Sequence, residues 1–199
     1  MSRLMGDSIR YKSAGTGRKV IVEQITMIVM LFFTGCAMVA LETTVCARIR
    51  IPLFGWSAAS PALGLLFSMA AGFLFGEREG GITGLFCGCL TDAAGIHTAV
   101  ANMVILPPLY FLCGYASGMI GRRRLAHNLP SFMVFSLVGG GIRCILSIGL
   151  AAVKLRALPP PVWVWRGLIP AWVLTVLFSA VVYGVTYGEK RLLEPKGNF

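Results

Sequence analysis

The stretch Gly80-Gly-Ile-Thr-Gly84-Leu-Phe-Cys-Gly88-Cys-Leu-Thr-Asp92 is apolar, carries glycine at four-residue spacing and ends in an acid. Residues four apart lie on one face of a helix, so these glycines predict a face without side chains that a neighbouring backbone can approach closely. In water each glycine would cost the helix about 1 kcal/mol relative to alanine. The pattern therefore favours a helix that packs against other helices inside a membrane.

The composition of the whole chain also indicates a membrane protein. Of its 199 residues, 56% are hydrophobic and 13% are charged, and the mean hydropathy is +0.77. Soluble domains are about 45–50% apolar and about 25% charged. The net charge of +10 would suggest nucleic acid as the partner of a soluble protein, but the basic residues here lie between apolar segments and at the chain ends. We therefore predict an all-α integral membrane protein that binds no nucleic acid.

Six apolar segments predict a six-helix transmembrane bundle. They cover residues 25–41, 61–76, 80–95, 99–121, 132–153 and 169–187. The second and third are short for a span of about 20 residues, so tilted half-helices or one re-entrant hairpin are alternatives to two full spans. We expect one transmembrane domain over residues 20–188, a basic cytoplasmic N-terminal segment over residues 1–19 and a cytoplasmic tail over residues 189–199.

The distribution of lysine and arginine predicts the orientation of this bundle. Positively charged loops stay in the cytoplasm, and six spans place both termini and the triplet Arg122-Arg123-Arg124 on the more basic side. Both termini are therefore expected in the cytoplasm. The triplet is interpreted as a topology anchor, with contact to anionic lipid as the alternative. The linker over residues 157–166 is too rich in proline at its start to be helical, and we expect it to be an interfacial loop on the outer side, with a surface for docking a partner as the alternative.

Two further patterns lie in the fourth segment. Pro107 and Pro108 fall in its middle, where the loss of two backbone donors predicts a kinked helix. Gly114 and Gly118 form a second GxxxG pattern, which predicts another close contact between helices.

Charged residues inside the predicted spans are energetically unfavourable in the membrane, so we expect them to have partners. Asp92 and Arg143 lie at matching depth, about 20 Å from the cytoplasmic boundary at 1.5 Å per residue, so an ion pair between the third and fifth helices is expected. In the alternative, Asp92 caps a helix end at the outer headgroups while Arg143 extends alone to the interface. Glu42 follows the first span and is interpreted as a solvated acid at the outer interface.

The sequence gives no sign of catalysis, a metal site or a cofactor. It contains no phosphate-binding loop, no HExxH or GxSxG motif, and no serine, histidine and acid set placed to act together. Five of the six cysteines lie in apolar segments, where cysteine acts as a small hydrophobe. The pair Cys87 and Cys89 lacks a second ligand pair at zinc spacing.

Three stretches together resemble the rod shape-determining MreD family. They are Leu41-Glu-Thr-Thr after the first span, Ser60-Pro-Ala-Leu at the start of the second, and Gly81 to Leu90 leading to Asp92. The family typically has glutamine where Glu42 stands and aspartate where Ala62 stands. The resemblance covers about residues 41–121.

The resemblance implies a noncatalytic scaffold in the bacterial plasma membrane. Such a scaffold binds MreC and links the MreB cytoskeleton, directly or indirectly, to the glycosyltransferase and transpeptidase of wall elongation. Asp92 is the residue carried over from the family motif, and the triplet Arg122-Arg123-Arg124 could contact MreB. The alternative is a substrate-binding component of an energy-coupling-factor vitamin transporter, whose general six-helix fold the MreD family is expected to share. An ion-coupled permease would need more acids within the membrane than the sequence offers.

Overall fold

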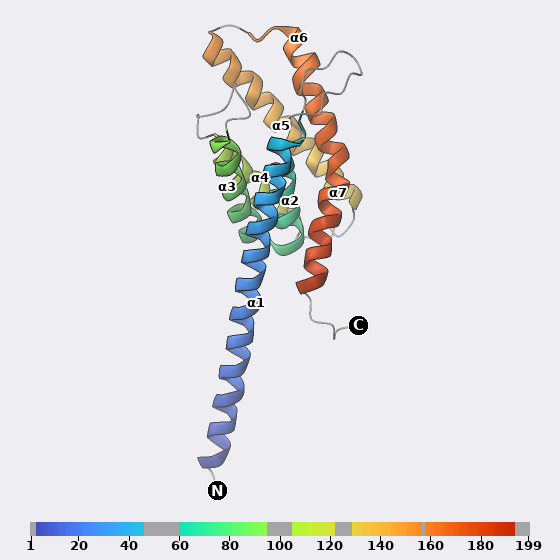
Figure 1. Cartoon of the computed structure of the whole chain (residues 1–199). Coiled ribbons are helices and arrows are strands. Elements are labelled where there is room, and N and C mark those ends of the chain that lie inside the picture. The colour runs from blue at the N-terminus through green and yellow to red at the C-terminus, as the bar shows by residue number, and fades with distance from the viewer. Residues whose placement is uncertain (1–2, 46–59, 95–104, 122–128, 157, 194–199) are drawn as a thin grey trace.

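The computed structural model of the chain describes residues 3–45, 60–94, 105–121, 129–156 and 158–193, and every regular element within these ranges is helical (Figure 1). In chain order the elements are α1 (Arg3–Thr44), α2 (Leu63–Phe75), α3 (Glu77–Ala93), α4 (Leu106–Gly121), α5 (Leu129–Leu155), α6 (Pro161–Trp163), the π-helical turn η3 (Val164–Leu168) and α7 (Ile169–Leu193). The predicted all-α class is confirmed.

Within the described ranges, three helices are long and apolar enough to cross a membrane. These candidate spans are Gln24–Thr44 in α1, Leu129–Val153 in α5 and Val164–Leu193 across η3 and α7. By contrast, α2, α3 and α4 have 13, 17 and 16 residues, fewer than the roughly 20 that a perpendicular span requires. The chain is therefore an all-α membrane protein, and its described part combines three long helices with three of 13 to 17 residues, besides the short α6 and η3.

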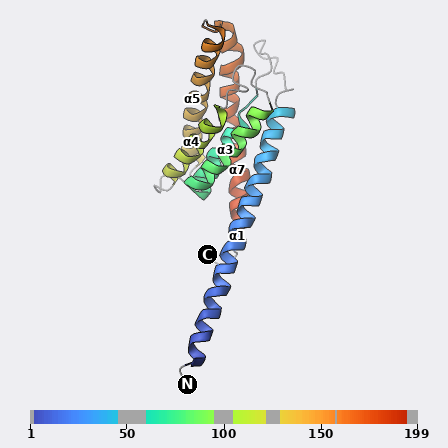
Figure 2. The same ribbon diagram turned by 90° about the vertical axis from the view of Figure 1, so that its left-hand side faces the viewer.

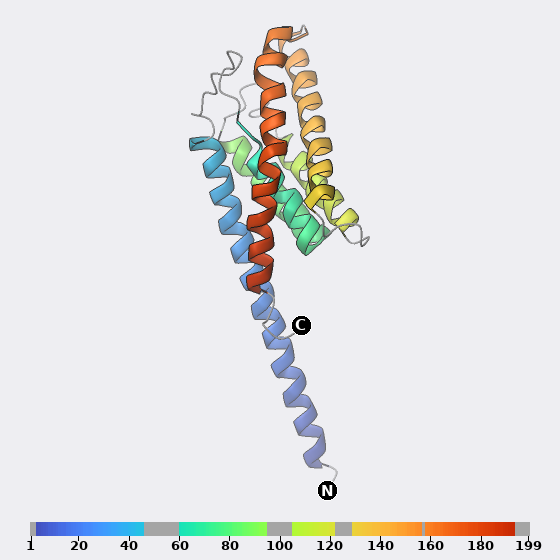
Figure 3. The same cartoon turned by 90° about the vertical axis from the view of Figure 1, so that its right-hand side faces the viewer.

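The short helices cross the long ones at an angle. α1 and α7 lie beside each other over part of their lengths, whereas α2, α3 and α4 are inclined to them and occupy a shorter layer (Figures 1 and 3). The N-terminal end of α1 extends far beyond this layer (Figure 2). The beginning of α1 and the end of α7 lie toward the same end of the molecule (Figure 3).

α2 is the centre of the core. Twelve of its 13 residues are buried, from Leu63 to Leu74, and it contacts α1, α3, α4, α5 and α7. A helix that is apolar on every side is stable only when other elements surround it completely. On the α5 and α7 side an aromatic cluster closes the core, with ring centroids 5.7 Å apart for Phe73 and Phe132 and 5.3 Å apart for Phe132 and Tyr183.

The glycine pattern produces the close packing that the sequence predicts. On α3, a Cβ atom at Gly84 would collide with the carbonyl oxygen of Tyr110, and one at Gly88 would lie 2.5 Å from Cα of Pro107. On α4, Gly114 faces the carbonyl of Gly80 and Gly118 faces the backbone of Glu77. We call this backbone contact between α3 and α4 the glycine seam, and it confirms the predicted close approach of helices.

One local prediction is wrong, and another is confirmed only in part. Pro107 and Pro108 do not kink the middle of a helix, because α4 begins at Leu106 and both prolines lie in its first turn. The N–H groups of a first turn have no partner within the helix, so their absence in proline costs no helical hydrogen bond. The linker is also more regular than expected. Residues 158–160 are not helical, but α6 starts at Pro161 and continues through η3 into α7, so the latter half of the linker extends the last helix.

Candidate functional site

The first turn of α2 is buried inside the bundle, and its backbone donors therefore need acceptors from other helices. Ala62, just before the helix, is 1% exposed. Its N–H donates to Oγ1 of Thr175 on α7 at 3.0 Å. The Thr175 hydroxyl in turn donates to the carbonyl oxygen of Ala171, one turn earlier in α7, at 2.7 Å. One side chain from α7 thus satisfies the start of α2.

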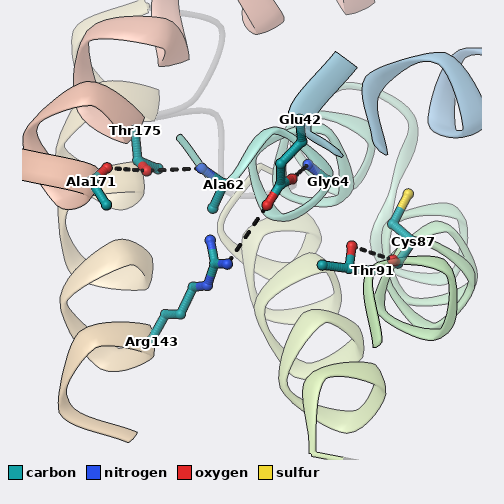
Figure 4. A network of polar contacts seen from close by, with 8 residues as sticks. All are labelled: Glu42, Ala62, Gly64, Cys87, Thr91, Arg143, Ala171 and Thr175. Atoms are coloured by element: carbon teal, nitrogen blue, oxygen red, sulfur yellow. Dashed lines mark hydrogen bonds and ion pairs between the residues drawn. The ribbon is translucent and has the colours of Figure 1, made fainter. Parts of the chain in front are cut away.

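The second acceptor at this helix start is Glu42, which lies near the end of α1 and is completely buried. Its Oε2 atom accepts the N–H of Gly64 at 3.0 Å. Its Oε1 atom lies 3.6 Å from Nη2 of Arg143 on α5. Figure 4 shows the carboxylate between the start of α2 and the guanidinium. We call Glu42, Arg143, Thr175 and the backbone of residues 62–64 the charge cluster.

Charges of opposite sign lie next to each other throughout the charge cluster. The N-terminus of a helix carries about half a positive charge, so a carboxylate is favourable there. The Arg143 guanidinium then compensates the carboxylate, and two charges are tolerated in a dry core only with such pairing and hydrogen bonding. The cluster joins α1, α2, α5 and α7 at one point.

The charge cluster also touches the glycine seam. The guanidinium carbon of Arg143 lies 6.0 Å from the ring centroid of Tyr110, within the range of a cation–π interaction. Tyr110 belongs to α4, is completely buried, and provides the carbonyl that faces Gly84. On α3, the buried Thr91 hydroxyl donates to the carbonyl oxygen of Cys87 at 2.8 Å. The charge cluster thus joins α1, α5 and α7 to the start of α2, and the glycine seam joins α3 to α4 beside it.

The interpretation of Glu42 as a solvated acid is wrong. The apolar length of α1 ends near this residue, which indicates an interface, but α2 begins directly beside it and covers it. The carboxylate that lies 3.6 Å from Arg143 is that of Glu42, which the sequence did not predict as its partner. The ion pair expected between Asp92 and Arg143 stays a prediction. Asp92 lies in the last turn of α3 and is partly buried.

A second buried acid was missed altogether. Glu189 was assigned to the cytoplasmic tail, but α7 continues to Leu193 and Glu189 is only 8% exposed. Its Oε1 atom accepts a hydrogen bond from the hydroxyl of Thr34 on α1. The neighbouring Lys190 and Arg191 in the sequence indicated a tail, whereas the spacing from Thr186 and Val182 places Glu189 on the buried face of the helix.

The remaining predicted residues divide into two groups. Gly84, Gly88, Gly114 and Gly118 all lie in the glycine seam. Arg122, Arg123 and Arg124 lie outside the described residues. Within the described part of the chain, no group of three or more histidine, cysteine, aspartate or glutamate side chains could hold a metal ion. Sequence reasoning missed Thr175 and Gly64, although Pro61 before an apolar run is a usual signal for a helix start that needs acceptors.

No protein-family model, curated protein or solved structure matches the chain. The fold and the charge cluster define the protein as an all-helical membrane protein with a buried helix start at its centre.

Replacement of Thr175 by valine tests the contribution of α7 to this helix start. Valine has the same shape but no acceptor, so the buried N–H of Ala62 loses its partner, and we expect the free energy of unfolding to fall by about 1–3 kcal/mol. The measurement is unfolding of the purified protein by denaturing detergent in mixed micelles. Thr26→Val is the matched control, since the Thr26 hydroxyl bonds only within the exposed face of α1. Equal effects of the two changes would contradict the capping role.

Proposed function

We propose that this protein is a noncatalytic scaffold of the MreD type in the bacterial plasma membrane. In this role it binds MreC and connects the MreB cytoskeleton, directly or indirectly, to the glycosyltransferase and transpeptidase of wall elongation. The membrane location rests on three candidate spans. The placement of both termini in the cytoplasm rests on the distribution of basic residues.

The observation that carries the proposal is the convergence of the resembling stretches. The first contributes Glu42, and the second contributes Ala62 and Leu63 at the start of α2, directly before Gly64, which donates to that acid at 3.0 Å. The third forms α3, whose glycines pack on α4 beside Tyr110. Stretches that are separate in sequence therefore meet around one helix start, as expected if they describe one structural unit of a family.

The chemistry of the charge cluster suits a scaffold. Its carboxylate accepts a backbone N–H and faces the guanidinium, and its hydroxyl bonds one backbone N–H and one backbone C=O. Such contacts fix how four helices are joined. A fixed arrangement of helices would present a constant surface to partner proteins in the membrane, and this is what we propose the cluster provides.

The test is purification of the tagged protein from its native membranes in mild detergent, followed by identification of the proteins that copurify. We expect MreC together with a wall glycosyltransferase or transpeptidase. A tagged multi-pass protein of similar abundance from the same membrane is the control for nonspecific recovery. Recovery of paired ATPases and a transmembrane coupling protein, without MreC, would contradict the proposal and identify a vitamin-capture subunit.

A further inference from the structure

A groove of about 260 Å³ runs between α1 and α3 on the outside of the bundle. Its walls are open to the surroundings, since Ile28 is 59% exposed, Phe32 is 49% exposed and Ile82 is 66% exposed. The two helices run in the same direction along the groove (Figure 2). In a membrane these side chains face lipid.

The groove changes from polar to apolar along its length. Gln24 on α1 lies toward one end with Arg78 and Glu79 on α3, and the apolar residues Leu31, Phe32 and Phe86 follow toward the other end. The Phe32 and Phe86 rings meet with centroids 4.3 Å apart. Eight residues separate Gln24 from Phe32, and eight separate Arg78 from Phe86, so the groove extends about 12 Å along both helices at 1.5 Å per residue.

This gradient has the direction of a membrane leaflet. Gln24 is the first residue of the candidate span in α1, so the polar end of the groove lies at the edge of the apolar layer. The apolar end lies deeper. One leaflet contributes about half of the roughly 30 Å hydrocarbon core, which the length of the groove nearly matches. A single acyl chain would therefore fit with its headgroup at the polar end.

The polar end offers one positive and one negative side chain. Arg78 is exposed and Glu79 is partly buried. Within the described residues, neither side chain makes a hydrogen bond or ion pair with the protein. A guanidinium is well suited to a phosphate, and a carboxylate is suited to a primary ammonium group. A zwitterionic headgroup carries both.

We propose that the groove between α1 and α3 binds a phospholipid with a primary amine headgroup, such as phosphatidylethanolamine. Its phosphate contacts Arg78, its ammonium group contacts Glu79, and one acyl chain lies between Ile28, Ile82 and Phe86. The source of the ligand is the surrounding membrane. The site does not depend on the scaffold function.

The experiment uses the full-length protein purified in detergent and native mass spectrometry with three added lipids that share the same acyl chains. These are phosphatidylethanolamine, phosphatidylcholine and phosphatidylglycerol. We expect preferential retention of phosphatidylethanolamine. Glu79→Gln should reduce that retention by about two- to fivefold, the size of a contact between charges that stay partly solvated, and should remove the preference over phosphatidylcholine. Arg78→Gln should weaken the binding of all three lipids.

Two further variants make the result specific to the groove. Ile82→Trp should fill the groove and prevent retention of all three lipids, while Arg191→Gln, an exposed charge in the last turn of α7, should change nothing. An unchanged thermal transition of each variant shows that it is folded. Equal or stronger binding of phosphatidylglycerol by the unmodified protein, or unchanged phosphatidylethanolamine binding by Glu79→Gln, would overturn the proposal.

Discussion

Replacement of Arg143 by glutamine should lower the free energy of unfolding by about 3–5 kcal/mol, the usual loss when one partner of a buried ion pair is removed. The fully buried Glu42 carboxylate, 3.6 Å from the guanidinium, would lose this compensating charge. Unfolding in mixed micelles by a denaturing detergent measures the loss. Arg191→Gln, which removes an exposed arginine from the end of α7, is the matched control and should cost less than about 0.5 kcal/mol.

Exchanging the two charges tests whether Glu42 acts only as the ionic partner of Arg143 or also as the acceptor that caps α2. Glu42 accepts the N–H of Gly64 in addition to facing Arg143, and arginine has no acceptor atom. The double variant Glu42→Arg/Arg143→Glu restores the pair of charges but places a cation at the positive end of α2. We therefore expect it to be no more stable than Arg143→Gln. Recovery of most of the lost stability by the exchange would contradict the capping role of Glu42.

Glu42→Gln and Arg143→Gln made together should lower the free energy of unfolding by less than the sum of their separate effects. The double variant Glu42→Gln/Arg143→Gln leaves no uncompensated charge in the cluster, and the amide oxygen introduced at position 42 can still accept the N–H of Gly64. A double-mutant cycle measures this coupling. Strict additivity would show that the two side chains act independently.

The parts of the fold that local sequence encodes were predictable. Apolar length identified α1, α5 and α7, and glycine spacing identified the seam, because a helix face without side chains has one main use in a membrane. The position of Glu42 was not predictable in the same way. Its burial depends on where α2 starts, which is set by contacts of the α2 start with α1 and α7 and not by residues near Glu42 in sequence.

The same reason explains the misplaced prolines and the missed acid. Pro107 and Pro108 are neutral at a helix start and disruptive in a helix interior, so their effect depends on a boundary that apolar length does not mark. Glu189 stands among charged residues, and its burial requires α1 to lie alongside α7 at Thr34. In each case a contact between distant segments, rather than local composition, determined the environment.

Replacement of Gly84 by alanine should destabilise the protein although alanine is the better helix former. The added methyl group would collide with the backbone carbonyl of Tyr110, and a backbone group inside a packed helix cannot rotate away. Overpacking of this kind costs about 1–3 kcal/mol, against a gain of up to about 1 kcal/mol in helix propensity. We expect a net loss of about 1–2 kcal/mol in the same unfolding measurement, and a larger one for Gly84→Leu.

Two other glycines provide the controls that make this prediction specific. A Cβ atom at Gly81, on the same helix, would meet the Phe111 side chain at 3.0 Å, and a side chain can shift. A Cβ atom at Gly184 on α7 would have no atom within 4 Å. The alanine variants should therefore rank Gly84 as most damaging, Gly81 as intermediate and Gly184 as neutral or slightly stabilising. If Gly84→Ala were as stable as Gly184→Ala, α3 and α4 would not be held together by backbone contact, and the glycine seam would have to be attributed to flexibility instead.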